Sequence, residues 1–360
     1  MAKLGRRKLL GGLLTGSAAA SVAAPVYAQG KRRLKMVTTW PKNFPGLGTA
    51  PENIAKRVRE MTDGQIDIKI YAAGELVGAF ESFDAVSTGT ADMYNGAEYY
   101  WQGKSKAFNF FTAVPFGMTA QELNAWIDFG GGRQLWEELS AKFNVIAFQS
   151  ANTGVQMGGW FNKEITSLDD FKGLKIRMPG LGGEVMRRLG AAAVSLPGGE
   201  IFPSLKSGAI DASEWVGPWN DLAFGFHQIT KFYYCPGFHE PCAGLSTGVN
   251  LDVWNSLSNS QQQIIRNACA AENAATTSEY NYKNAAALNT LVSKHKVKVR
   301  SFSPQIMQAL KTTSDAVLQD AAKSDAFTAK VYESFKASLA NSMEWGALSE
   351  EPYTQARRSV

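Results

Sequence analysis

The chain has 360 residues, of which 45% are hydrophobic, 11% aromatic and 19% charged. This composition excludes a low-complexity or disordered chain, and the length suits two domains, or two lobes around one cleft. With 37 basic and 32 acidic side chains the formal net charge is +5, which by itself would allow a nucleic-acid or membrane-surface partner. Where those charges lie decides whether such a partner is needed.

The first 28 residues carry most of the excess charge. They contain four basic residues and no acidic one, so the rest of the chain has 33 basic and 32 acidic side chains, a balance of +1. The basic start, the apolar stretch from Leu9 to Val26 and the small residues before Gln29 predict a cleaved export signal. Arg6-Arg7 also fits a twin-arginine signal. We therefore expect a signal peptide at residues 1–28, a periplasmic mature protein, and no nucleic-acid partner.

Two runs of alternating strands and helices follow the export signal. The first predicts strand, helix, strand, helix and strand at residues 34–39, 51–61, 65–71, 76–87 and 91–94. Two helices and two strands are then expected at residues 120–129, 134–143, 144–150 and 156–161. The second run predicts a strand, two helices and a strand at residues 174–177, 182–189, 199–206 and 211–215. Such alternation is typical of parallel or mixed sheets covered by helices, so the expected class is α/β with two lobes.

The C-terminal part of the chain is predicted to be helical. No Pro or Gly occurs from Ser258 to Lys296, and Ser258 with Gln261 has the spacing of a capping box, so we expect one helix of up to about 38 residues or two with a soft break. Pro304 is expected to open a further helical region that ends near residue 342. We predict lobe I at residues 29–152 plus about 241–258, lobe II at 153–240, and a region at 259–360 that braces the lobes or reaches a second subunit.

Three cysteines and three histidines restrict the chemistry that the chain can carry. In an oxidising compartment Cys235 and Cys242 are the closer pair for one disulfide, with three free thiols as an equal alternative. Cys269 lies in a helical pattern and is expected to be buried and free. The histidines are too few and too scattered along the sequence for a zinc site: His227, His239 and His295.

The segment Gly-Leu-Ser-Thr-Gly at residues 244–248 matches the nucleophile elbow of hydrolases. That motif needs a helix directly after the serine turn and a later acid and histidine. Here the following residues continue a strand pattern, and the only later histidine, His295, lies in the predicted long helix. We therefore interpret residues 245–251 as an ordinary strand.

Charged residues at predicted strand ends are the candidates for ligand binding. Arg177 ends one strand just before Pro179-Gly180, where a guanidinium can bind a carboxylate; an Arg on the surface is the alternative. Glu214 lies beside Trp215 at the end of another strand, and a carboxylate in such apolar surroundings needs a metal cation or a basic partner. Glu240 is a second such carboxylate, and the alternative is that both are unrelated surface acids.

Four segments together resemble the solute receptors of tripartite ATP-independent periplasmic (TRAP) transporters, over nearly the whole mature chain. They are Thr39-Trp40-Pro41, Gly89-Thr90-Ala91-Asp92-Met93, Leu174-Lys175-Ile176-Arg177-Met178-Pro179 and Leu205-Lys206-Ser207-Gly208-Ala209-Ile210-Asp211-Ala212. The resemblance implies a two-lobed fold of the periplasmic-binding-protein type with a cleft between the lobes. It also implies that Arg177 binds the carboxylate of the ligand.

Within that family the chain resembles the branch that binds 2-oxo or 2-hydroxy monocarboxylic acids with a metal cation. The residues that carry this resemblance are Gln156, Glu214-Trp215 and Glu240. The resemblance implies that Arg177 and Gln156 bind the ligand carboxylate, with Trp215 and Tyr100 also at the ligand. It implies that the cation is surrounded by Gln156, Glu214, Glu240 and the backbone carbonyl of Trp215.

Charge counting at these residues independently favours a cation. Two glutamates and a ligand carboxylate against one Arg leave two uncompensated negative charges, which is costly in a closed cleft. Na⁺ would leave one negative charge and Ca²⁺ none, and oxygen ligands suit either ion. We expect Na⁺, with Ca²⁺ as the alternative.

The sequence therefore predicts a periplasmic receptor that closes on a 2-oxo acid such as pyruvate and delivers it to TRAP membrane subunits. The receptor is expected to catalyse no reaction itself. By the same resemblance, the long helix after Ser258 exchanges between subunits of a homodimer. One alternative is an exported enzyme acting on a small carboxylic acid. The other is the same receptor fold with specificity for lactate, a C4-dicarboxylate or a sugar acid.

Overall fold

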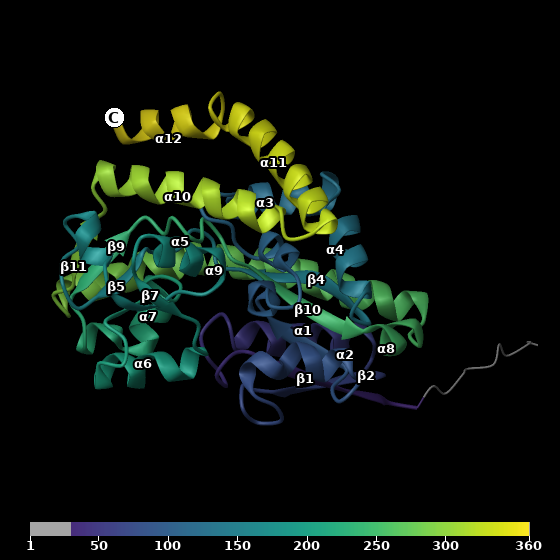
Figure 1. Cartoon of the computed structure of the whole chain (residues 1–360). Coiled ribbons are helices and arrows are strands. Elements are labelled where there is room, and N and C mark those ends of the chain that lie inside the picture. The colour runs from purple at the N-terminus through teal and green to yellow at the C-terminus, as the bar shows by residue number, and fades with distance from the viewer. Residues whose placement is uncertain (1–29, 360) are drawn as a thin grey trace, which may run out of the picture. The chain divides into compact units, whose positions relative to one another are not determined.

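The computed structural model describes residues 30–359, so the predicted export signal at residues 1–28 lies outside the described part. The described residues from Lys31 onward form one compact unit that contains two β-sheets (Figure 1). Within the described residues no helix has the length and apolar character needed to cross a membrane. The sheets and the helices around them confirm the predicted α/β class.

The first sheet has five strands in the order β2-β1-β3-β10-β4. β1 is parallel to β2 and β3, whereas β10 is antiparallel to β3 and β4. The strands are β1 (Arg32–Thr38), β2 (Ile66–Tyr71), β3 (Met93–Gly96), β4 (Val145–Asn152) and β10 (Gly244–Asn250). Ser246 lies in the middle of β10, fully buried, and its hydroxyl donates to Glu98. The Gly-Leu-Ser-Thr-Gly segment is therefore a strand, as predicted.

Helices and short 3-10 turns accompany the first sheet. They are α1 (Thr49–Met61), η1 (Ala79–Glu81), α2 (Ser82–Ser87), η2 (Glu98–Trp101), η3 (Lys106–Phe111), α3 (Ala120–Phe129), α4 (Gly132–Ala141) and α8 (Leu251–Asn255). The predicted helix at 76–87 is wrong in its first half. The Glu81 carboxylate accepts from the amide of Gly78 at 3.1 Å, and this bond starts a 3-10 turn at residue 79 in place of a longer helix.

The second sheet has six strands in the order β11-β9-β5-β8-β6-β7. They are β5 (Gly159–Phe161), β6 (Lys175–Arg177), β7 (Ala192–Val194), β8 (Ala212–Ser213), β9 (Phe232–Cys235) and β11 (Lys298–Ser301). The predicted strands at 156–161 and 211–215 are shorter than expected: β5 begins only at Gly159, where φ is +118°, and β8 ends at Ser213, so the adjoining residues form two loops. Those loops carry the candidate site residues.

The strands β6 and β8 are parallel neighbours, so their carboxyl ends meet at one edge of the sheet. The accompanying helices are η4 (Leu168–Phe171), α5 (Gly180–Arg188), α6 (Gly198–Ser207), α7 (Pro218–Phe224) and η5 (Phe226–Gln228). Gly180, at the start of α5, has φ +61°, and a side chain there would also approach Tyr99 to 3.4 Å. The turn after Arg177 therefore requires glycine.

The long helix α9 (Asn259–Ser293) begins at the capping box of Ser258 and Gln261, as predicted. The Thr276 hydroxyl accepts from the amide of Asn152 in β4 at 3.1 Å, and the Tyr280 hydroxyl donates to Asn220 of α7 at 2.8 Å. α9 thus contacts an element of the first sheet and a helix that follows a strand of the second. The lobe boundaries themselves stay a prediction.

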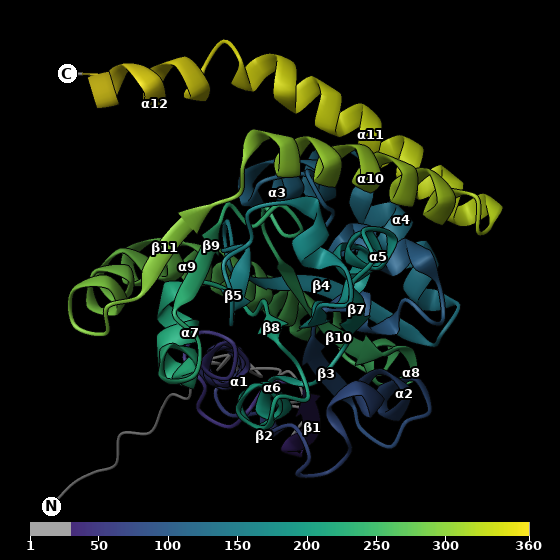
Figure 2. The same cartoon turned by 60° about the vertical axis from the view of Figure 1, so that its left-hand side comes forward.

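The region after Pro304 consists of three helices, where the sequence predicted one helical region ending near residue 342. They are α10 (Pro304–Ala322), α11 (Ala326–Gly346) and α12 (Glu350–Ser359). The break after α10 arises because the Asp325 side chain accepts from the amide of Thr328 at 2.9 Å and caps a new helix. Figure 2 shows α12 extending away from the sheets, and none of its described residues is buried.

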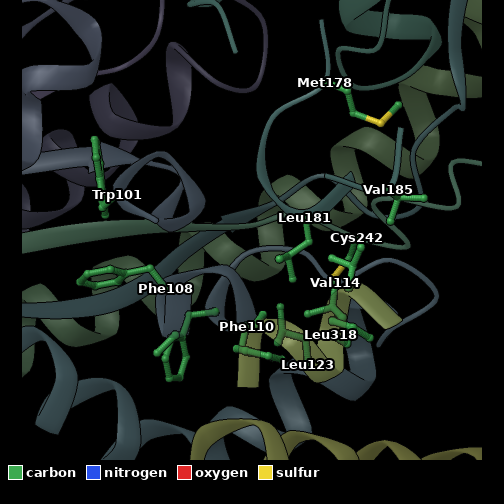
Figure 3. Close-up of a cluster of buried hydrophobic side chains, with 14 of the residues drawn as sticks. Trp101, Phe108, Phe110, Val114, Leu123, Met178, Leu181, Val185, Cys242 and Leu318 are labelled. Carbon is green, nitrogen blue, oxygen red and sulfur yellow. The ribbon is translucent and has the colours of Figure 1, made fainter. Parts of the chain in front are cut away.

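One buried hydrophobic cluster joins elements from both halves of the chain (Figure 3). Trp101 and Phe108 come from the 3-10 turns after β3, Leu181 and Val185 from α5, and Leu318 from α10. Burial of side chains of this size contributes about 1.5 to 3 kcal/mol each. This cluster therefore holds the turn after Arg177 against the segment that contains Tyr100.

The three cysteines are free thiols, so the Cys235–Cys242 disulfide is wrong and the alternative of three thiols is correct. Cys269 is buried, as predicted. Burial raises the pKa of the Cys242 and Cys269 thiols to about 12. Neither thiol is therefore reactive at neutral pH.

Candidate functional site

The adjacent ends of β6 and β8 place Arg177 beside Glu214. Arg177 pairs with Ser213 in the parallel register, and the amide of the next residue, Glu214, donates to the Arg177 carbonyl at 3.2 Å. Their side chains form an ion pair between Nη1 and Oε1 and are 1% and 0% exposed. The alternatives of a surface Arg and a surface acid are therefore wrong for these two residues.

The guanidinium of Arg177 has four of its five N–H donors engaged. Nε donates to the Leu196 carbonyl at 3.1 Å, and Nη1 donates to the Glu214 carbonyl at 3.3 Å and to its carboxylate. Nη2 donates to the Tyr100 hydroxyl at 3.3 Å. One Nη2 donor remains, next to a hydroxyl that can itself donate. This pair of groups can receive an anion without breaking any contact of Arg177.

Two loops place Gln156 and Glu240 together. The Gln156 amide donates to the Glu240 carbonyl at 3.2 Å, and the Gly237 amide donates to the Gln156 carbonyl at 3.0 Å. A side chain at Gly237 would come within 2.5 Å of the Gln156 carbonyl oxygen, so only glycine permits this approach. Gln156 and Glu240 are 3% and 2% exposed. Glu240 is therefore a buried carboxylate of the loop next to Gln156, not a surface acid.

Several oxygen atoms at this site are buried and have no hydrogen-bond partner. They are Oε1 of Gln156, Oε2 of Glu214 and Oε2 of Glu240. The carbonyl oxygen of Trp215 likewise receives no hydrogen bond from any donor in residues 30–359. An unpaired buried polar atom costs about 1 to 3 kcal/mol, and more when it is charged. Carboxylate, carboxamide and carbonyl oxygens are the ligands of hard cations, so these atoms fit a Na⁺ or Ca²⁺ ion.

His239 is a site residue that the sequence reasoning missed. It is 2% exposed, and its Nε2 lies 3.4 Å from Oε2 of Glu214 without hydrogen-bond geometry. Ligand atoms of Glu214, His239 and Glu240 all lie within 4.8 Å of one another. The one signal for His239 in the sequence is its position directly before Glu240, and the wide spacing of the three histidines argues against a zinc site there.

The electrostatics of the site show an excess of negative charge. Burial raises the pKa of Glu240 well above its usual value, and the charge of Glu214 raises it further, while Arg177 opposes the shift. Burial alone would lower the pKa of Arg177, but the combined effect of Glu214, Tyr100, Tyr99 and Glu240 outweighs burial and the pKa rises. With both carboxylates ionised, one Arg would leave one negative charge before any acid arrives, and the raised pKa of Glu240 reflects that cost. A bound cation would stabilise both carboxylates in the ionised form.

Aromatic rings form the rest of the site. The Trp215 ring centroid lies 5.2 Å from Cζ of Arg177, and Trp40 lies 6.3 Å from both Trp215 and Tyr100, centroid to centroid. Phe80 packs on Tyr100 at 4.6 Å. A separate hollow of about 260 Å³, lined by residues of α3, α4, β4 and α9, includes none of these residues. The site is thus defined by enclosed polar groups with an apolar surround.

A two-sheet α/β fold that encloses a cluster of charged and polar side chains is typical of a class of protein that binds a small charged solute. Residues 36–325 match the family of bacterial extracellular solute-binding proteins, family 7. The chain belongs to this family and is a periplasmic solute receptor of the TRAP type.

Three relatives support this membership. A monocarboxylate 2-oxoacid-binding periplasmic protein from Nostoc sp. is 44% identical over 321 residues, which cover 89% of this chain and 88% of that protein. A TRAP solute-binding protein from Bordetella bronchiseptica, a dimer with copurified calcium and picolinate, has 34% identity and a TM-score of 0.89 over 91% of this chain and 98% of that one. A TRAP solute-binding protein from Pseudoalteromonas atlantica with bound sodium and pyruvate has 39% identity and a TM-score of 0.88, over 91% of this chain and 99% of that one.

Proposed function

We propose that this receptor binds a 2-oxo monocarboxylate such as pyruvate together with a metal cation. The observation that carries the proposal is the set of unpaired buried oxygens beside a single Arg. These oxygens need a positive charge, and the free donors of Arg177 and Tyr100 need a negative one. A small anion and a cation bound side by side satisfy both needs.

The ligand carboxylate is received by Arg177, by the Tyr100 hydroxyl and by the Gln156 side chain. The Nε2 of Gln156 already donates to Thr153 at 3.1 Å and keeps one further N–H, while its Oε1 is open. Gln156 can therefore serve the acid through nitrogen and the cation through oxygen. This double use agrees with its predicted role in both sets of residues.

The cation is held by Gln156, Glu214, Glu240 and the Trp215 carbonyl. When bound, it supplies positive charge to the carboxylate and the 2-oxygen of the acid. Both choices of ion have support, because one relative holds calcium and the other sodium. We propose Na⁺, with Ca²⁺ as the alternative that neutralises the site completely.

The aromatic surround favours a short apolar tail on the acid. Trp40, Trp215 and Tyr100 offer ring surface and no further cation, so a second carboxylate would lack a partner. We propose that pyruvate and similar 2-oxo acids bind better than C4-dicarboxylates or sugar acids. Lactate tests whether the 2-oxygen must be a carbonyl.

The bound acid is handed to the membrane subunits of a TRAP transporter, and the receptor itself performs no reaction. We also propose a homodimer, in line with the dimeric Bordetella bronchiseptica relative. Apolar residues are exposed on the C-terminal helices and their connection, with Trp345 at 70%, Leu348 at 81% and Tyr353 at 67%. These three exposed side chains could contact a second subunit, in addition to the long helix α9 that the sequence predicted for this role.

The experiment that tests this proposal is a titration followed by tryptophan fluorescence. The dialysed mature protein is titrated with 2-oxo acids, 2-hydroxy acids and dicarboxylates, each in metal-free buffer, with Na⁺ and with Ca²⁺. We expect tight binding of pyruvate only when a cation is present. Equal affinity in metal-free buffer would contradict the cation, and conversion of pyruvate to a product would contradict the receptor.

A further inference from the structure

Asp221 is a buried carboxylate that takes no direct part in the proposed site. It lies in α7 and is 1% exposed. Its Oδ1 accepts from the amide of Val216 at 3.2 Å. Its Oδ2 accepts from Nε1 of Trp160 at 3.0 Å and from the hydroxyl of Tyr233 at 2.6 Å.

The amide of Val216 belongs to the same peptide group as the carbonyl of Trp215. Because the peptide is planar and trans, its N–H and C=O point in opposite directions. A partner that fixes the N–H of Val216 therefore also fixes the direction of the Trp215 carbonyl. That carbonyl receives no hydrogen bond from the described residues, whereas the N–H behind it is bonded to the Asp221 carboxyl group.

We propose that Asp221 is the positioning residue of the cation site: it holds the Trp215–Val216 peptide and increases the negative charge on the Trp215 carbonyl oxygen. A carboxylate that accepts from a peptide N–H draws electron density toward the carbonyl end, through the resonance that makes the peptide planar. The inference rests on the proposed function, because it assigns a role toward the same cation.

Asp221 is held rigidly enough for this role. Trp160 of β5 and Tyr233 of β9 stack with ring centroids 4.1 Å apart, and both bond to the same carboxylate oxygen. On the other side, the Val216 carbonyl accepts from the amide of Met157 at 3.0 Å. Met157 directly follows Gln156, so the next peptide of the chain, Val216–Gly217, is tied to the loop of a second proposed ligand of the cation.

The test uses a pair of variants of the full mature chain, Trp160→Phe and Trp160→Phe/Asp221→Asn. In Trp160→Phe alone, Asp221 keeps its carboxyl group and its bond to Val216. Burial raises the pKa of Asp221 to about 7, so both variants are compared at a pH well above this value, where the carboxyl group is ionised. In the double variant, the side-chain oxygen of the Asn that replaces Asp221 can still accept from the Val216 amide, and the new NH2 group can donate to the Tyr233 hydroxyl. The main difference between the two variants is therefore the lost negative charge. Calorimetric titration with CaCl2 and with NaCl, in the absence of pyruvate or any other 2-oxo acid, measures the cation affinity directly.

We expect the double variant to bind Ca²⁺ about 10- to 100-fold more weakly than Trp160→Phe, the range that partners of metal ligands usually show. The Na⁺ affinity should fall by a smaller factor, because a lost negative charge acts twice as strongly on a divalent ion. A purely structural role would lower both affinities alike. A Ca²⁺ affinity within twofold of Trp160→Phe, or equal losses for both ions, would overturn the inference.

A second measurement on the unaltered protein covers the case in which the double variant does not fold. During a Ca²⁺ titration the amide proton of Val216 should shift downfield in the NMR spectrum, because a cation on the Trp215 carbonyl strengthens the bond of the same peptide to Asp221. If Ca²⁺ binds and the Val216 signal does not move, the role of Asp221 is overturned while the proposed function stands. If the wild-type protein binds neither cation, the proposed function itself fails.

Discussion

Arg177→Lys is the substitution whose effect can be worked out most fully from the structure. Arg177→Ala would leave Glu214 buried without a partner, which costs about 3 to 5 kcal/mol of stability and risks unfolding. Lys keeps the positive charge beside Glu214 but has three donors on one atom in place of a planar fork. It cannot serve the Leu196 carbonyl, Glu214 and the ligand together. The lost charge-assisted bond to the acid is worth about 1.5 to 3 kcal/mol, or about 10- to 150-fold in affinity.

The assay for this substitution is a pyruvate titration at saturating Ca²⁺, with thermal unfolding as the check of folding. Arg187→Lys is the matched control, because Arg187 is exposed and pairs with Glu184 on the surface of α5 at 3.0 Å. We expect Arg177→Lys to remain folded and lose at least tenfold in affinity, and the control to be unchanged. Unaltered pyruvate affinity in folded Arg177→Lys would refute the assignment of Arg177 to the ligand.

Three further predictions concern the cation, a buried acid and the C-terminus. Glu240→Gln removes one negative charge from the cation site and should weaken Ca²⁺ binding at least tenfold in calorimetry; undiminished binding would exclude Glu240 as a ligand. Burial raises the pKa of Glu98 from 4.5 to about 7, so the folded protein retains a proton that the unfolded chain loses. The unfolding free energy should therefore fall, by up to about 3 kcal/mol, as pH rises from about 4.5 to about 7, and Glu98→Gln should lack this contribution in urea unfolding. If the unfolding free energies of the wild type and Glu98→Gln differed by the same amount at every pH, the predicted role of the Glu98 proton would be contradicted. Deletion of residues 347–360 removes no buried side chain among the described residues 347–359 and should change the free energy of unfolding by less than about 0.5 kcal/mol, while light scattering should show loss of the proposed dimer.

Elements with a strong local pattern were predictable from the sequence. The helix at 120–129 has the observed bounds, and α9 starts at the capping box that Ser258 and Gln261 indicated. The short strands β7, β9 and β11 were not predicted, because three or four residues give too little periodicity. β11 pairs with β9 from more than sixty residues away, a contact that no local signal reports.

The candidate site was predictable only in part. The strand ends carrying Arg177 and Glu214 followed from the alternation of strands and helices, and the structure brings these residues together with Gln156, Tyr100, Trp215 and Glu240. Their roles toward ligand and cation stay proposals. His239 and Asp221 could not be placed, because each reaches the site through contacts made by loops, and loop geometry depends on bonds such as Gly237 to Gln156.

The most direct test of the central claim, a cation and an acid bound side by side, is the coupling between them. Calorimetry gives the pyruvate affinity with and without Ca²⁺, and the Ca²⁺ affinity with and without pyruvate. Linkage requires the two ratios to be equal, and we predict a common factor of at least about 10 in favour of joint binding. A factor of one, with pyruvate and Ca²⁺ binding independently, would contradict the account.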